Sequence, residues 1–123
     1  MPAPIRRSLA VLVTAAALAG CGSGPTAQVK SGSFTVTLDD YLIRPQQIRM
    51  ASAGRLTVTV HNIGRLGHTF RIRSANHVVL AISTLAPGAT KTRTFRLAPG
   101  HYTTFCALAN HEELGMRGTL VVH

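Results

Sequence analysis

The sequence predicts an all-β protein, an antiparallel β-sandwich of about seven strands. From residue 34 onward, short runs in which apolar and polar residues alternate recur along the chain. Sequences rich in Gly, Pro and Asn separate these runs, and no segment has the apolar spacing of an amphipathic helix. Strands of roughly five to seven residues bounded by such turns are typical of two sheets packed face to face.

The alternating runs identify the strands and the face of each strand that points inward. In chain order their apolar positions are Phe34, Val36 and Leu38; Leu56, Val58 and Val60; Phe70 and Ile72; Val79 and Ala81; and Leu120 and Val122. Turn sequences stand at Ala53-Gly54, Asn62-Ile63-Gly64, Ala86-Pro87-Gly88 and Ala98-Pro99-Gly100, and Pro45 lies in an irregular approach to a strand near Ile48. About 90 residues can bury one core, and without an internal repeat we expect a single domain.

Residues 1–20 have the layout of a bacterial lipoprotein signal peptide. Arg6 and Arg7 give a positive start, and the uncharged apolar run that follows is too short to span a bilayer comfortably. The run ends in Leu18-Ala19-Gly20-Cys21, which resembles the lipobox, where the signal is cut before a cysteine that is acylated. An ordinary signal peptide that happens to contain a cysteine is the alternative.

The lipoprotein interpretation divides the remaining chain into a tether and a domain. Cys21 becomes the acylated first residue, and the stretch 21–33, rich in Gly, Ser, Pro, Thr and Ala, is expected to be a flexible tether. Residues 34–123 form the folded domain. The protein is then exported and anchored to the outer face of a bacterial membrane, on the periplasmic or extracellular side.

The domain is basic, which limits the partners that suit it. The chain has 13 Lys and Arg residues against 4 Asp and Glu, and removal of Arg6 and Arg7 with the signal leaves a net charge of +7. Such a charge favours an anionic membrane face or an acidic protein partner. Export and the scatter of the arginines along the chain argue against nucleic acid. Nothing demands a dimer, so we expect a monomer.

Cys106 is the most informative single residue. If Cys21 is acylated, Cys106 is the only thiol of an exported protein and has no partner for an internal disulfide. A lone thiol outside the cytoplasm is prone to oxidation, which favours a metal ligand or a reactive site at this position.

Soft and borderline metal donors are regularly spaced near the C-terminus. Cys106, His111 and Met116 follow one another as C-x4-H-x4-M, between a strand that ends at Cys106 and another that starts near Arg117. Such a loop is short enough to fold its three donors around one centre. A fourth donor must come from a neighbouring strand, and His68, which follows a turn and opens a strand, is suitably placed.

These motifs resemble those of the cupredoxin, or type 1 blue-copper, family over nearly the whole mature domain. The matching features are N-x-G-x3-H from Asn62 to His68, G-x-Y-x3-C from Gly100 to Cys106, the C-x4-H-x4-M spacing and a closing strand. The resemblance implies a Greek-key sandwich with one mononuclear copper. His68, Cys106 and His111 are then its trigonal ligands and Met116 its weak axial ligand. It also implies a non-enzymatic carrier that exchanges single electrons, by outer-sphere transfer, with a donor and an acceptor protein.

The resemblance also implies surroundings for the copper ligands. The residue after the first histidine is often Asn in the family, where it ties the two ligand loops together; Thr69 stands here, and its hydroxyl can make a related bond. Asn62 is the other expected supporting residue. The C-terminal histidine tends to be the electron port, within an apolar patch expected here from Leu66, Gly67, Leu108 and Leu114. Glu112 and Glu113 interrupt that patch, either tuning the centre or merely facing water.

Other functions fit the sequence less well. A Cys106–His111 nucleophile pair would need a helix N-terminus and an oriented base, and neither is visible. Zinc would usually recruit a carboxylate or another Cys or His in place of a thioether. A periplasmic copper chaperone or storage protein on the same fold is the main alternative, although such proteins rely more often on methionine clusters, and the mature chain has only Met50 and Met116.

Overall fold

The computed structural model of the protein describes residues 25–123, and the expected signal peptide and Cys21 lie outside that range. The described residues form ten strands and no helix, so no helix long and apolar enough to cross a membrane occurs among them. The strands are β1 (Thr26–Val29), β2 (Ser33–Asp39), β3 (Leu42–Arg44), β4 (Gln47–Met50), β5 (Gly54–Asn62), β6 (His68–Ser74), β7 (His77–Leu85), β8 (Thr90–Leu97), β9 (Gly100–Phe105) and β10 (Arg117–Val122). The all-β prediction is confirmed.

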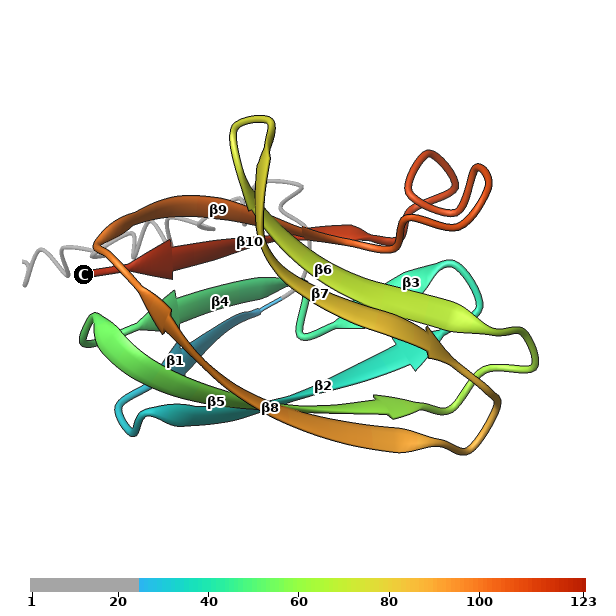
Figure 1. Cartoon of the computed structure of the whole chain (residues 1–123), viewed down its shortest axis with the longest axis horizontal. Helices are drawn as coiled ribbons and strands as arrows, with labels where there is room; N and C mark the ends of the chain where they lie inside the picture. The colour runs from blue at the N-terminus through green and yellow to red at the C-terminus, as the bar shows by residue number, and fades with distance from the viewer. Residues whose placement is uncertain (1–24) are drawn as a thin grey trace, which may run out of the picture.

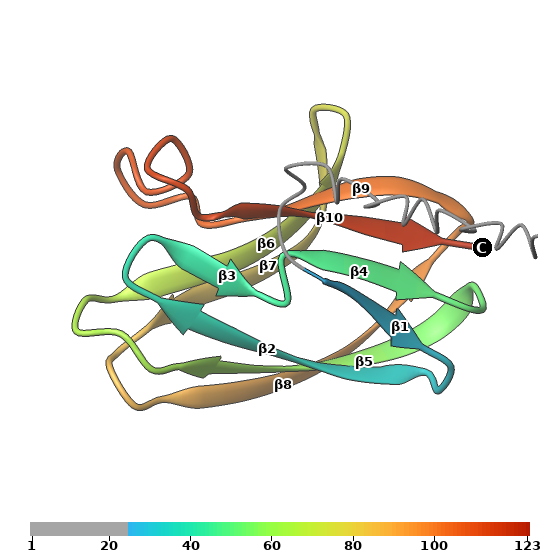
Figure 2. The same cartoon turned by 180° about the vertical axis from the view of Figure 1, so that it is seen from behind.

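The strands form two sheets that pack face to face (Figures 1 and 2). One sheet has six strands in the order β1-β4-β10-β9-β6-β7, and the other has four in the order β3-β2-β5-β8. Three of the pairings, β1–β4, β4–β10 and β2–β5, are parallel, so the sheets are mixed rather than purely antiparallel. Between β2 and β5 the chain crosses to the other sheet as β4 and returns, which lets two neighbouring strands run in the same direction.

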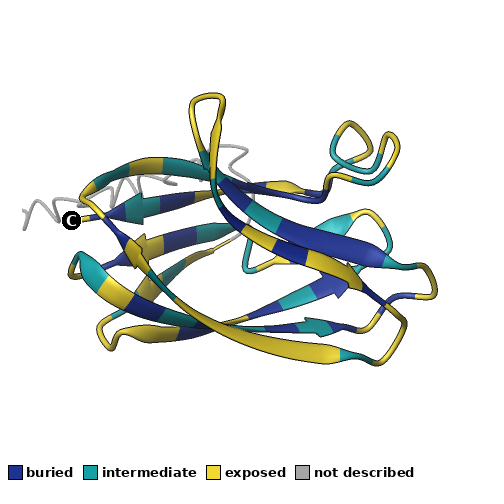
Figure 3. Cartoon of the chain, in the orientation of Figure 1, coloured by how far each residue is buried: buried dark blue, intermediate teal, exposed yellow. Residues whose placement is uncertain are grey.

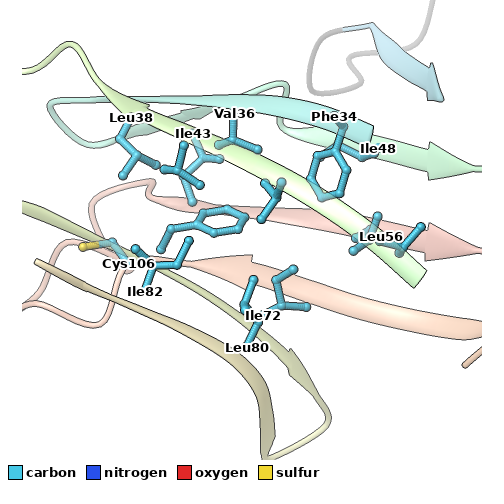
Figure 4. Close-up of a cluster of buried hydrophobic side chains, with 14 of the residues drawn as sticks. Phe34, Val36, Leu38, Ile43, Ile48, Leu56, Ile72, Leu80, Ile82 and Cys106 are labelled. Carbon is cyan, nitrogen blue, oxygen red and sulfur yellow. The ribbon is translucent and has the colours of Figure 1, made fainter. Parts of the chain in front are cut away.

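The core lies between the sheets and follows the alternation seen in the sequence. The inward residues of β2 and β5, such as Val36 and Val58, are fully buried, whereas their outward neighbours are polar and partly exposed (Figures 3 and 4). Phe70 and Ile72 reach the same core from β6 of the facing sheet. Cys106 belongs to this buried cluster as well, so the hydrophobic core extends up to the expected metal ligands.

Two expectations about strands are wrong. Residues 26–29, expected to lie in the tether, form β1, which pairs in parallel with β4 at the edge of the larger sheet. This edge strand is only four residues long and none of its residues is fully buried, so hydrophobic periodicity did not identify it. In β7 the buried residues are Leu80, Ile82 and Leu85, while Ala81 is exposed. The nearly continuous apolar run there carries no clear period, and β-bulges shift its register against β6.

The topology gathers several connections at one end of the sandwich. β6 begins with His68 at this end, where β9 also ends and β10 begins, with Phe105 paired to Arg117. The turn between β2 and β3 lies here too. Figure 1 shows these connections together on the right-hand side, with the long β9–β10 loop projecting from the sheet. The predicted strand ends on both sides of that loop are confirmed.

Candidate metal centre

Three donor side chains converge at this end of the sandwich. His68 opens β6, Cys106 directly follows β9, and His111 comes from the β9–β10 loop; one donor atom of each lies within 4.8 Å of the others. The Nδ1 atoms of the two histidines are 3.2 Å apart, and Cys106 Sγ is 3.7 Å from His111 Nδ1. His68 and Cys106 are buried and His111 is half-buried. The two imidazoles therefore direct the same nitrogen, Nδ1, toward each other, and the Nδ1 of His111 also faces the thiol.

Met116 completes the donor set from the end of the same loop. Its side chain is fully buried in the core cluster next to the ligand end of the sandwich. The loop is closed by backbone hydrogen bonds: Cys106 N–H donates to the Met116 carbonyl at 3.1 Å, and Met116 N–H donates to the His111 carbonyl at 3.0 Å. These bonds hold the residues of the C-x4-H-x4-M motif in a compact loop.

The chemistry of these donors fits copper. Two imidazoles, a thiolate and a thioether combine borderline and soft ligands, a set that suits copper in both of its oxidation states. His68, Cys106, His111 and Met116 are positioned as a type 1 copper site. Zinc would prefer a harder or more thiolate-rich fourth ligand to a buried thioether.

Thr69 links the two segments that carry the ligands. Its backbone N–H and its hydroxyl lie 3.4 and 3.6 Å from Cys106 Sγ, within reach of weak hydrogen bonds to sulfur. The same hydroxyl oxygen accepts a 2.8 Å hydrogen bond from the Ala107 N–H. The Thr69 hydroxyl therefore makes the cross-link between the two segments that was expected of it.

Asn62 shapes the loop that leads into His68. Its fully buried amide donates to the carbonyls of Leu66 and Leu85 at 2.8 and 2.9 Å, and its oxygen accepts from the Gly64 N–H at 2.9 Å. A buried side chain that satisfies three backbone groups holds the loop in one conformation. Asn62 contacts neither sulfur nor imidazole, so it supports the site only through this loop.

Two residues of the β2–β3 turn contact the histidines and were not identified from the sequence. Asp40 Oδ1 lies 2.9 Å from His68 Nε2, and the Tyr41 ring meets the His111 ring edge-on with 5.2 Å between centroids. The hydrogen bond from His68, together with that from the Arg65 backbone, holds the pKa of Asp40 below its ordinary value. Asp40 therefore carries its negative charge at neutral pH.

Exposed apolar side chains lie on the loops at the His111 end of the sandwich, but they differ in part from the expected patch. Of the five exposed large hydrophobic residues in the range 25–123, four lie on loops at this end: Tyr41, Ile63, Leu66 and Leu114. Leu108, by contrast, is half-buried and packs against the core, and Gly67 is half-buried. Leu66 and Leu114 therefore present the most apolar surface among the expected patch residues, and Ile63 and Tyr41 extend it.

Glu112 does not simply face water. Both of its carboxylate oxygens accept hydrogen bonds from the Arg73 guanidinium, one of them at 3.1 Å from Nη1 and the other in a shorter contact with Nη2. Arg73 in turn lies over the Phe105 ring, 4.2 Å from its centroid. The hydrogen bonds from Arg73 lower the pKa of Glu112. Its charge is thereby largely balanced, whereas Glu113 is exposed.

This ion pair predicts a pH-dependent contribution to stability. Because the folded-state pKa of Glu112 is lowered, the contribution is present above the unfolded-state pKa of about 4.3 and is lost as the pH falls through the folded value. We expect Glu112→Gln to lower the free energy of unfolding of the copper-free protein by roughly 0.5–1 kcal/mol at neutral pH, a modest value because the pair is partly exposed.

Urea unfolding at neutral pH and near pH 3 measures the contribution of the ion pair to stability, with Glu113→Gln as the matched control. The difference between wild type and Glu112→Gln should be smaller at the lower pH, and the control should match wild type at both. An equal loss at both pH values would show that the ion pair is not its cause.

The remaining histidines lie apart from the centre. His61 contacts the Thr90 hydroxyl and His123 contacts Arg49, while His77 and His101 are exposed on strands. A groove of about 440 Å³, lined by Pro25, Leu42, Ile43, Arg44, Pro45 and Gln46, contains none of the four donors. The convergent donors, and not this groove, mark the functional end of the molecule.

Comparison with known proteins agrees with this geometry. Residues 8–122 match the family described as Cupredoxin-like domain. No curated protein matches the chain. Among solved structures, reduced auracyanin from the photosynthetic bacterium Roseiflexus castenholzii has 20% identity, with 76% of this chain and 98% of that chain covered and a TM-score of 0.69.

Two further structures share the fold. Rusticyanin from Thiobacillus ferrooxidans has 17% identity, with 83% of this chain and 84% of that chain covered and a TM-score of 0.66. An azurin from the obligate methylotroph Methylomonas sp. strain J has 20% identity, with 74% of this chain and 97% of that chain covered and a TM-score of 0.63. At these identities the likeness is one of fold.

Proposed function

Since the chain belongs to the cupredoxin-like family, we propose that it carries single electrons between redox proteins through a type 1 copper held by His68, Cys106, His111 and Met116. The observation that carries the proposal is the convergence of three donor atoms within 4.8 Å of one another. Each of the three is braced by its surroundings: Thr69 contacts Cys106 Sγ, Asp40 holds His68 Nε2, and Tyr41 packs on His111.

The construction of the site suits electron transfer better than catalysis. Copper held there would alternate between Cu(II) and Cu(I), carrying one electron at a time. The core packs around His68, Cys106 and Met116, which are all buried, so these residues leave no open face for a substrate. Braced ligands move little when the charge at the centre changes, and we therefore assign no catalytic residue.

His111 is the natural route for the electron. It is the one half-buried member of the converging His68–Cys106–His111 set, and Leu66 and Leu114, which are 41% and 51% exposed, lie on the two loops beside it. An apolar surface of this kind suits a transient contact with another redox protein, because it allows close approach with little desolvation cost. We propose that donor and acceptor both dock at this end, while the rest of the domain stays clear of them.

We further propose that the protein works on the outer face of a bacterial membrane, anchored through acylated Cys21. Support comes from the lipobox-like sequence and from the basic charge of the domain. Because β1 begins at Thr26, only four residues lie between the lipid-bearing cysteine and the sandwich, and the five steps from Cys21 to Thr26 reach about 17 Å when fully extended. The copper domain would therefore stay close to the membrane surface.

Replacing the expected lipid site tests the anchor. In a bacterial host fed a clickable fatty acid, the full-length chain should become labelled, and Cys21→Ser should lose the label completely because serine has no thiol to acylate. Ser23→Ala, two positions away, should label like wild type. Equal labelling of the Cys21→Ser variant, or an unlabelled wild type, would favour the ordinary signal peptide instead.

Copper titration of the purified protein tests the proposed function. We expect one equivalent of Cu(II) to bind with an intense blue absorption, and one electron to bleach and restore the colour reversibly while the copper stays bound. A chaperone or storage protein would instead bind copper without the colour or release it on reduction. The structure offers little for that alternative, because Met50 is buried in β4 and Met116 is the one other methionine among residues 25–123.

A further inference from the structure

The turn between β2 and β3 places a carboxylate directly behind a copper ligand. Asp40 Oδ1 lies 2.9 Å from His68 Nε2, the nitrogen on the far side of the ring from the Nδ1 atom that faces His111. His68 is fully buried, and the Asp40 side chain is 27% exposed. The imidazole thus lies between His111 and a carboxylate, and each of its nitrogens has a defined neighbour.

The surrounding loop is built around this carboxylate. Asp40 also accepts hydrogen bonds from the backbone N–H groups of Arg65 and Leu66, at 3.0–3.2 Å. A Cβ atom at Gly64 would overlap Asp40 Oδ1 and approach His68 Nε2, so this position has room for glycine alone. The β5–β6 loop, the β2–β3 turn and the ligand ring are therefore packed as one unit.

A carboxylate in this position determines which nitrogen of His68 carries the proton. Ionised Asp40 can only accept, so Nε2 must be protonated to make the 2.9 Å hydrogen bond, and Nδ1 is then left with its lone pair. Nδ1 is the nitrogen that faces His111 within the converging donor group. Carboxylates that hold metal-bound histidines in this way fix the ring and make it a stronger donor.

Among the four carboxylates in residues 25–123, Asp40 alone contacts a ligand side chain in the structure. Asp39 accepts a hydrogen bond from the Asp40 N–H at 2.8 Å, Glu112 is paired with Arg73, and Glu113 is exposed. The charge of Asp40 is therefore the one most strongly coupled to the centre.

We propose that Asp40 is a positioning residue of the copper centre, which holds His68 with Nδ1 free for copper and uses its charge to favour Cu(II) over Cu(I). This inference rests on the proposed function as a type 1 copper carrier. The reduction potential of this protein is then set in part by a residue outside the ligand motifs. Loss of the Asp40 charge weakens the binding of Cu(II) more than that of Cu(I), because the higher cationic charge gains more from a nearby anion.

Comparison of Asp40→Asn with Glu113→Gln tests the effect of the charge. Both changes remove one negative charge at the same end of the molecule, but only the first concerns a group bonded to a ligand. We expect Asp40→Asn to lower the ratio of Cu(II) to Cu(I) affinity about tenfold, which corresponds to a rise of about 59 mV in the one-electron reduction potential. Glu113→Gln should change the reduction potential much less. Equal shifts in the two variants would overturn this part of the proposal.

Nitrogen-15 NMR of the histidine side chains tests the positioning, and it needs no copper. In wild type we expect His68 to be protonated at Nε2 alone when neutral. In Asp40→Ala, which removes the acceptor, both tautomers should be populated. An unchanged Nε2 tautomer in Asp40→Ala would overturn the positioning role. If Asp40→Ala does not fold, the reduction potential of Asp40→Asn still tests the proposal. A copper-loaded wild type without blue colour would refute the carrier function itself. A blue wild type whose Asp40 variants behave like it would refute only the role of Asp40.

Discussion

The Cys106→Ser variant is expected to lose the blue absorption completely while keeping its fold. The colour of a type 1 centre comes from charge transfer between the cysteine thiolate and Cu(II), and a serine hydroxyl does not ionise to replace the thiolate. Serine is nearly isosteric, and its oxygen can still accept the hydrogen bonds that Thr69 directs at Cys106 Sγ. The loss of colour should therefore occur without a large loss of structure.

Visible absorption after addition of one equivalent of Cu(II) measures the effect, with circular dichroism as the check on folding. Met50→Leu is the matched control, because it removes another soft, fully buried sulfur from the core at a small cost in packing. It should stay as blue as wild type. A blue Cys106→Ser protein would mean that the copper is held elsewhere, and the ligand assignment would have to be abandoned.

Truncation of Phe70 should have the largest effect on stability. Its ring is fully buried at the centre of the core, two residues after His68 on β6 and opposite Ile82 on β7. Phe70→Ala removes the ring and leaves a cavity between the sheets, and we expect a loss of about 3–5 kcal/mol in the free energy of unfolding. This is a large part of the roughly 5–15 kcal/mol that stabilises a typical domain.

Urea unfolding of the copper-free protein measures this loss. Val78→Ala is the control, because Val78 is 39% exposed on β7 and its truncation should change stability by no more than about 0.5 kcal/mol. Binding of copper should recover part of the stability of Phe70→Ala, since a ligand of the folded state shifts the equilibrium toward it. A loss below about 1 kcal/mol would show that this ring is not a principal contributor to the core.

The predictable parts of the fold are the strands with one face buried in the core and the other exposed to solvent. In β2 and β5 strict alternation made both the strand and its inward face evident, and the C-x4-H-x4-M spacing located the ends of β9 and β10. β8 shows little alternation of buried and exposed residues because it is an edge strand, and Leu97 is its one buried residue. Parallel pairing follows from how the chain crosses between sheets, which local periodicity does not report.

The ligands were predictable for a different reason from their surroundings. Three of the four donors lie within one loop, so their spacing along the chain reflects their geometry directly. Asp40, by contrast, lies 28 positions before His68 in a turn that reaches the site only through the sandwich topology. Nothing local distinguishes Asp40 from Asp39 in the sequence, and only the fold shows which of them faces the histidine.

The rate of electron self-exchange tests directly whether the protein carries electrons through its copper centre. Copper-loaded protein is prepared as a mixture of the Cu(I) and Cu(II) forms, and the broadening of NMR signals from residues near His111 is followed as the Cu(II) fraction rises. We expect broadening that grows with the concentration of oxidised protein while all copper stays bound, because electrons pass between molecules through a centre that rearranges little. Copper lost on reduction, or no measurable exchange at any concentration, would contradict an electron carrier and favour a copper-handling protein.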